Sequence, residues 1–135
     1  MDRQVISEVQ STWKIVEGIA PQAAALFYNN LFAADPSLKP LFKGNMEEQG
    51  KKLMQMIGAA VGKLDDLDTL VPILQGLAKR HRGYGVQEAH YGTVGATFLK
   101  TLEQGLGPAF TPQVKTSWAT VYGVMSSVMI ATAKE

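Results

Sequence analysis

Three polar side chains interrupt otherwise apolar helix faces and are the first candidates for chemistry. Tyr28, Gln49 and His81 lie in three separate segments, where steps of three or four residues otherwise give Leu, Met, Ile or Ala. Burying a hydrogen-bonding group costs free energy unless a partner or a ligand satisfies it. From periodicity alone, His81 is either a metal ligand or a satisfied core histidine. Tyr28 can be core packing with its hydroxyl bonded to a backbone carbonyl, and Gln49 can be a solvated residue near a helix start.

Other common kinds of chemistry have no support in the sequence. The chain has no cysteine and only two histidines, His81 and His90. Disulfides, thiolate metal sites, cysteine nucleophiles and iron–sulfur clusters are therefore excluded. Motifs of phosphate-binding loops, dinucleotide sites, zinc proteases and serine hydrolases are absent, as is the Glu-x-x-His pair of di-iron bundles.

The composition indicates one folded domain with a weak net charge. The 135 residues include 46% hydrophobic and 19% charged residues, and 13 basic against 12 acidic residues give a net charge of +1. Such a balance offers little attraction to nucleic acid or to an anionic membrane. The chain has no N-terminal apolar leader and no apolar run long enough to span a bilayer. We therefore expect a cytoplasmic protein with neither nucleic acid nor a membrane among its partners.

Hydrophobic periodicity predicts an all-α chain of six or seven helices, because no segment alternates as a strand would. The first helix is expected to begin with Ser7 as its N-cap and to end at Gly18. Pro21 suits the first turn of the second helix, and Asp35-Pro36 predicts a short helical turn.

The remaining helices are longer, and each has one apolar face. They are expected from about Glu47, from Leu67, from about Gln87 and from Thr111, which is followed by Pro112. His81 continues the apolar face of the helix from Leu67, just before a glycine-rich stop. Helix bundles and globin-like packings are the architectures that fit this pattern.

Several stretches of the chain occur in an order and spacing that match a known family. Ala34–Phe42 is similar to a turn whose proline opens a short helix and whose phenylalanine wedges against haem. Gln49–Met54 is similar to the start of a distal helix, and Leu77–Val86 to a proximal segment. The other matching features are His90-Tyr91, Val94-Gly95, Trp13 and the spacing from Trp118 to Tyr122. Together they resemble the single-domain bacterial globins, similar to the globin domain of flavohaemoglobins, and imply one globin domain over residues 1–135.

The resemblance implies haem b (iron protoporphyrin IX) as the cofactor and a role for each matching residue. His81 is expected to be the proximal iron ligand, and Tyr28 and Gln49 the distal pair that hydrogen-bonds dioxygen. The residues expected to contact the haem are Phe42 as its clamp, Leu53 and Val86 as apolar walls, Lys52 near a propionate, and Tyr91 beside the proximal imidazole. His90 is expected to be a surface or capping residue.

The chain departs from the family pattern near its C-terminal end. In relatives of this type a tyrosine at position 91 is placed to bond the proximal imidazole, and in some of them a glutamate completes that network. Spacing from Trp118 puts Ala133 where that glutamate would be. The departure weakens the case for peroxidase-like or oxygen-activating catalysis. The cations Lys79, Arg80 and Arg82 are a solvated helix end or partners of haem propionates.

Three functions follow from these expectations. The leading hypothesis is a haem globin that binds dioxygen, nitric oxide or carbon monoxide reversibly and releases dioxygen slowly. An enzymatic alternative is nitric oxide dioxygenation, which converts dioxygen and nitric oxide to nitrate and would need an external reductase. The third hypothesis is a haem-free globin-like sensor or interaction domain, against which His81 argues.

Overall fold

The computed structural model describes residues 2–42, 44–83 and 88–134, with the side chains of all but residues 82 and 83. These residues form helices and no strand, which confirms the predicted all-α class. The elements are α1 (Arg3–Glu17), α2 (Ala20–Ala34), the 3-10 helix η1 (Pro36–Leu41), α3 (Met46–Gly62), α4 (Leu67–Gly83), α5 (Glu88–Leu106), the 3-10 helix η2 (Gly107–Ala109) and α6 (Pro112–Ala133).

Side-chain caps set several of the helix starts. Asp35 caps η1 by accepting the backbone N–H of Ser37 at 3.1 Å, and Thr111 caps α6, as the sequence predicts. The predicted start of α1 at Ser7 is wrong. Asp2 is the N-cap instead and accepts the N–H of Gln4 at 3.0 Å, so the N-cap of α1 lies five residues earlier than predicted.

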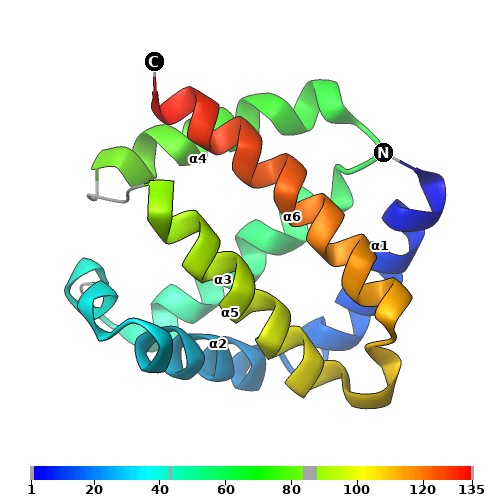
Figure 1. Cartoon of the computed structure of the whole chain (residues 1–135), viewed down its shortest axis with the longest axis horizontal. Helices are drawn as coiled ribbons and strands as arrows, with labels where there is room; N and C mark the ends of the chain where they lie inside the picture. Colours follow the sequence, from blue (N-terminus) through cyan, green and yellow to red (C-terminus); the bar gives the residue numbers. More distant parts are fainter. Residues whose placement is uncertain (1, 43, 84–87, 135) are drawn as a thin grey trace.

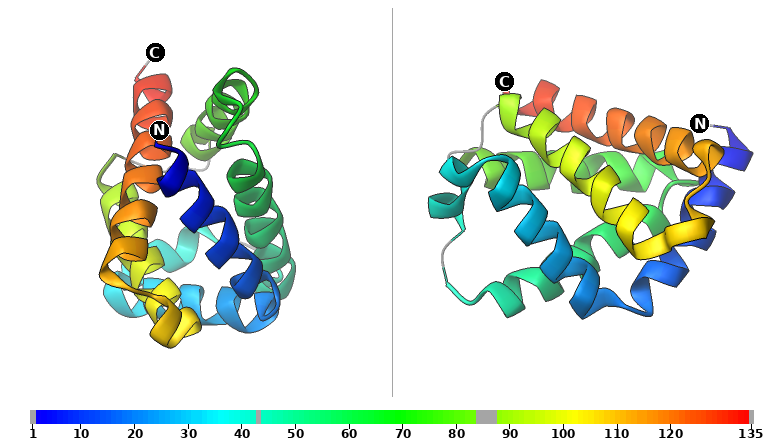
Figure 2. Two further views of the ribbon diagram at one scale, coloured as in Figure 1. Left: turned by 90° about the vertical axis from the view of Figure 1, so that its right-hand side faces the viewer. Right: turned by 60° about the horizontal axis from the view of Figure 1, so that its bottom comes forward.

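Two groups of helices pack across one core (Figure 1). α6 packs on α1, α4 and α5, and α2 packs on α5 and α3. Figure 2 shows α5 and α6 running in opposite directions beside each other, with α2 and α3 on the other side of the molecule. The chain ends lie at opposite sides of the view in Figure 1.

The centre of the core is a tryptophan on α6. Trp118 is fully buried, and its ring lies 6.0 Å from that of Trp13 and 5.4 Å from that of Phe98. Its Nε1 donates a hydrogen bond to Oγ1 of Thr12 at 2.9 Å. α1, α5 and α6 are therefore joined at one point by aromatic packing and a buried hydrogen bond.

α6 carries no charged residue between Lys115 and Lys134. Its buried side supplies Val114, Trp118 and Val121 to the core, and its exposed positions are mostly small. None of the helices in the described ranges combines the length and the apolarity needed to cross a membrane.

Candidate functional site

His81, the predicted proximal residue, lies in the last turn of α4. The imidazole is half-buried, and its Nδ1 lies 2.6 Å from the backbone oxygen of Leu77, one turn earlier. A carbonyl oxygen can only accept, so Nδ1–H donates this hydrogen bond, and the tautomer with a proton on Nδ1 has its lone pair on Nε2. This tautomer suits a metal ligand that is oriented by the backbone of its own helix.

Tyr28, the predicted distal residue, lies on α2. Its side chain is 7% exposed, yet its hydroxyl makes no hydrogen bond to any residue of the described ranges. The backbone-bonded alternative considered from the sequence is therefore not found there. Burial raises the pKa of Tyr28 to about 12, so the phenol remains protonated at neutral pH. The hydroxyl is thus a donor from which a ligand can accept a hydrogen bond.

Aromatic packing holds the Tyr28 ring in place. Phe42, at the end of η1, meets it edge-on with ring centres 5.4 Å apart, and Phe32 stacks on it at 6.1 Å. Phe32 and Phe42 also contact each other at 5.5 Å. The short η1 turn thus brings Phe42 to the distal side. Phe32, which the sequence analysis did not assign to the site, is found at i+4 from Tyr28 on the same helix face.

Gln49 lies in the first turn of α3. Asn45 caps this helix by accepting the N–H groups of Glu47 at 2.8 Å and Glu48 at 3.2 Å. The side chain of Gln49 is half-buried.

The next residue, Gly50, lets α3 approach α2 closely. A Cβ at this position would lie 2.9 Å from the Cβ of Ala24 and 4.0 Å from Cε2 of Tyr28. Gly50 therefore sets the spacing between the helices that carry Tyr28 and Gln49. Sequence reasoning missed it, and the available signal was a glycine in a helix interior directly after a candidate ligand-binding residue.

The other predicted haem contacts differ in how far their side chains are buried. Leu53 is partly buried against the core, and Lys52 is exposed on α3. Val86 lies outside the described residues. Tyr91 is half-buried on α5, and burial raises its pKa. The expected bond from its hydroxyl to the imidazole is not present among the described residues, where Nδ1 of His81 faces Leu77 instead.

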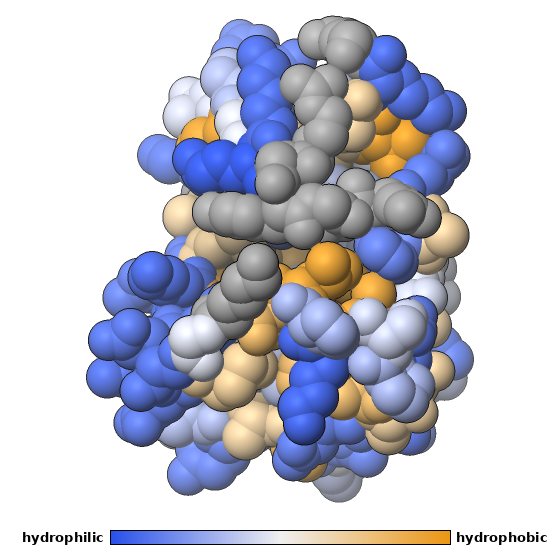
Figure 3. Space-filling view, turned by 90° about the vertical axis from the view of Figure 1, so that its left-hand side faces the viewer, coloured by the Kyte–Doolittle hydropathy of each residue, from blue (hydrophilic) through white to orange (hydrophobic). Residues whose placement is uncertain are grey.

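Two further sets of residues that the sequence analysis named lie on α5 and near the end of α4. His90 is half-buried on α5, and Lys79 and Arg80 are exposed near the end of α4. Figure 3 shows the face that carries the end of α4 and the start of α5, with apolar side chains gathered between hydrophilic margins.

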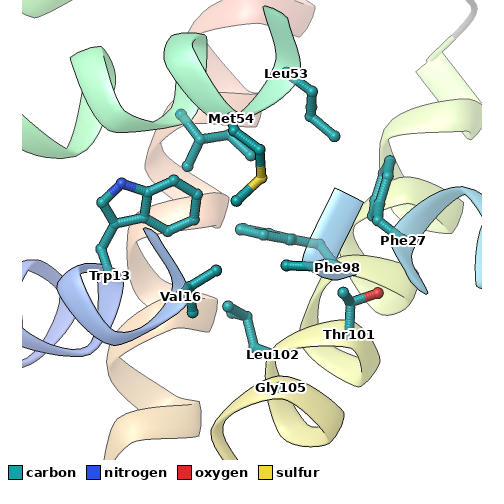
Figure 4. A pocket seen from close by; sticks show the side chains of 11 residues that line it. Trp13, Val16, Phe27, Leu53, Met54, Phe98, Thr101, Leu102 and Gly105 are labelled. Atoms are coloured by element: carbon teal, nitrogen blue, oxygen red, sulfur yellow. The ribbon is translucent and has the colours of Figure 1, made fainter. Parts of the chain in front are cut away.

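A small apolar cavity lies behind the distal residues, where α1, α2, α3 and α5 meet. The cavity has a volume of about 10 Å³. Trp13, Leu53 and Phe98 are among the lining side chains (Figure 4). The hydroxyl of Thr101, also on the wall, is already bonded to Thr97 and Asn30. A water molecule needs two to four polar partners, so we expect this space to be dry.

Together these residues fit a haem group. The imidazole of His81 is oriented by its own helix backbone, and the Tyr28 hydroxyl has no partner among the described residues. The two helices that carry them, α4 and α2, both contribute side chains to the hydrophobic core. Haem brings its own metal, and an imidazole is a suitable ligand for its iron.

Comparison with known proteins agrees with this fold. Residues 25–129 match the Globin family. The chain is 28% identical over 140 residues to a flavohemoprotein of Bacillus subtilis; the match covers all of the chain and 35% of that protein, so the chain spans about a third of its length. A solved bacterial globin from Campylobacter jejuni superposes with a TM-score of 0.86 at 27% identity, covering 98% of this chain and 96% of the other.

A second solved structure supports the fold alone. It is an engineered carbene transferase from Rhodothermus marinus, described as a candidate nitric oxide dioxygenase, with a TM-score of 0.89 at 21% identity, covering 99% of this chain and 94% of the other. The expected globin fold is confirmed by the family match and by both superpositions. The chain therefore belongs to the globin family and has bacterial globins among its relatives.

Proposed function

We propose that this chain is a haem globin that binds dioxygen and other diatomic ligands reversibly and holds dioxygen tightly. The observation that carries the proposal is the Tyr28 phenol, which is 7% exposed and whose hydroxyl makes no hydrogen bond to any described residue. A phenol held in this way can donate its hydrogen bond to a ligand.

The chain's own residues would divide the work as follows. His81 would supply Nε2 as the axial ligand, with its ring oriented by the Leu77 carbonyl. Phe42, Leu53 and Val86 would bound the ring system, and Lys52 would face a propionate. Haem b, once bound, supplies the iron to which a diatomic ligand attaches.

The distal donors predict slow release of dioxygen. Tyr28 and Gln49 would each donate a hydrogen bond to the ligand, and each bond in a dry pocket contributes about 1–3 kcal/mol. A difference of about 1.4 kcal/mol is a factor of ten in affinity. Retention, sensing or chemistry therefore fits this site better than rapid delivery.

The proximal side favours binding over oxygen activation. Nδ1 of His81 bonds to a neutral carbonyl, and Ala133 stands where some relatives have a carboxylate. A carboxylate partner would make the imidazole a stronger electron donor than a carbonyl does.

Nitric oxide dioxygenation is the second candidate, and the flavohemoprotein relative favours it. That relative is about three times as long as this chain. Turnover here would require an external reductase to restore the ferrous state. A catalytic cycle that forms nitrate only when a reductase is added would support this second function.

The test is an absorption spectrum of the ferrous protein before and after dioxygen, followed by the dioxygen dissociation rate. Tyr28→Phe and Gln49→Leu should each raise that rate by about tenfold or more, because each removes one donor. Gln55→Leu is the matched control, since Gln55 is exposed on the same helix as Gln49. Absence of a Soret band would instead favour the haem-free alternative, and unchanged rates would reject the distal assignment.

A further inference from the structure

A tyrosine on α6 is bonded to the helix that carries Tyr91. The hydroxyl of Tyr122 donates a hydrogen bond to the backbone oxygen of Tyr91 at 2.5 Å. Burial, followed by the nearby Tyr91 phenol, raises the pKa of Tyr122 to about 12, so this donor is protonated at neutral pH. In an α-helix the carbonyl of Tyr91 also accepts the N–H of Gly95, and its second lone pair is the one that Tyr122 uses.

The ring of the same tyrosine lies against the backbone of Gly95, one turn further along α5. A Cβ built at Gly95 would be 2.5 Å from Cε2 of Tyr122, 3.0 Å from Cδ2 and 3.1 Å from Cζ. These distances leave no room for a side chain. Tyr122 therefore contacts one turn of α5 twice, through its hydroxyl at Tyr91 and through its ring at Gly95.

This contact lies between the elements that flank the proximal side. α6 packs on α4, which carries His81, and on α5, which carries Tyr91. Tyr122 and Ala133 are eleven residues apart on α6, about three turns, so they lie on the same face of that helix. Just beyond the end of α6, Lys134 pairs with Glu88, the first residue of α5, at 3.6 Å.

We propose that Tyr122 and Gly95 form a positioning contact that fixes the Tyr91 turn of α5 against α6, the helix that also packs on α4 and its His81. Tyr122 is a positioning residue, because it acts through the backbone of Tyr91. The inference rests on the proposed haem function, since it assigns the contact to the orientation of the proximal residues.

The first experiment compares Gly95→Ala with Gly92→Ala. A Cβ at Gly92, on the same helix, meets nothing within 4 Å, so Gly92→Ala is the matched control. Gly95→Ala should speed hydrogen exchange of the amides of residues 92–95 by about three- to tenfold, and Gly92→Ala should not. In a Tyr122→Ala background the effect of Gly95→Ala should vanish, because the ring that its Cβ meets is gone. Equal effects in both backgrounds would overturn the contact.

The second experiment distinguishes a positioning role of Tyr122 from an effect on the stability of the fold alone. Tyr122→Phe keeps the ring and removes the hydroxyl. In the ferrous haem-loaded protein it should shift or broaden the iron–histidine stretching band, while Ser127→Ala, at an exposed position of α6, should leave the band unchanged. An unchanged band in Tyr122→Phe would overturn the inference and leave the haem function standing. A wild-type protein without a Soret band would overturn both.

Discussion

At the scale of single residues, the account depends on polar groups whose hydrogen-bond partners are unusual. Tyr28 is a buried phenol with no partner among the described residues, and His81 has its Nδ1 fixed by the Leu77 carbonyl. The Tyr28 phenol can donate a hydrogen bond to a ligand, and the His81 ring is oriented by the backbone of its own helix. A small-ligand site needs both an oriented base and a donor.

The two buried tyrosines predict how stability changes in alkaline solution. The pKa of Tyr28 and of Tyr122 is raised to about 12 in the folded chain, whereas an unfolded tyrosine titrates near 10. Between these values the folded state keeps protons that the unfolded state loses, so the free energy of unfolding falls as pH rises from 10 towards 12. Urea unfolding at several pH values should show this fall flattened in Tyr28→Phe combined with Tyr122→Phe. An equally steep fall in the double variant would contradict this prediction.

Gly50 gives a steric prediction for the contact between α3 and α2. In Gly50→Ala the new Cβ would lie 2.9 Å from that of Ala24, so α3 and α2 must separate. We expect a loss of about 1–3 kcal/mol in the free energy of unfolding and faster dioxygen dissociation, because overpacking displaces Gln49. Gly62→Ala, in open space on the same helix, should be neutral or stabilise by up to about 1 kcal/mol. Similar stability in the two variants would show that the approach of α3 is not tight.

The residues that sequence reasoning found and missed differ in kind. Tyr28, Gln49 and His81 were identified because a polar side chain on an apolar stripe breaks a period. Gly50 and Gly95 were not assigned a function, because the space around a glycine is set by another helix. The bond between His81 and Leu77 depends on a rotamer, which no sequence pattern determines.

At the scale of elements, α6 is the central helix of the packing. It packs on α1, α4 and α5 and carries Trp118, the fully buried centre of the core. Most helices were predictable from capping residues and apolar spacing, including the start of α6 at Thr111. The start of α1 was not, because Ser7 and Asp2 are both good N-caps and only the packing of the first turn decides between them.

The buried hydrogen bond between α1 and α6 can be tested by an isosteric substitution. Thr12→Val removes the acceptor of the buried Trp118 N–H and leaves that group unpaired, which should lower the free energy of unfolding by about 1–3 kcal/mol. Thr120→Val makes the same change at an exposed position of α6 and should alter it by less than about 0.5 kcal/mol. Chemical denaturation measures both. Equal losses would mean that the buried bond contributes nothing of its own.

At the scale of the whole molecule, the globin architecture packs helices that are far apart in sequence, among them those of Tyr28 and His81, around one hydrophobic core. Its class was predictable because the apolar stripes and the order of the motifs agree. The arrangement of the helices came from the resemblance, since periodicity alone left a helix bundle open. The lining of the apolar cavity depends on how α1, α2, α3 and α5 meet, which periodicity does not specify.

The most direct test of the account is haem binding by His81→Gly, compared with His90→Gly. Both variants remove an imidazole and put a glycine in a helix, and only His81 is the proposed iron ligand. The ferrous absorption spectrum and the rate of haem loss should change strongly in His81→Gly, be restored by added imidazole, and stay close to wild type in His90→Gly. An unchanged spectrum and an unchanged rate of haem loss in His81→Gly would contradict the account.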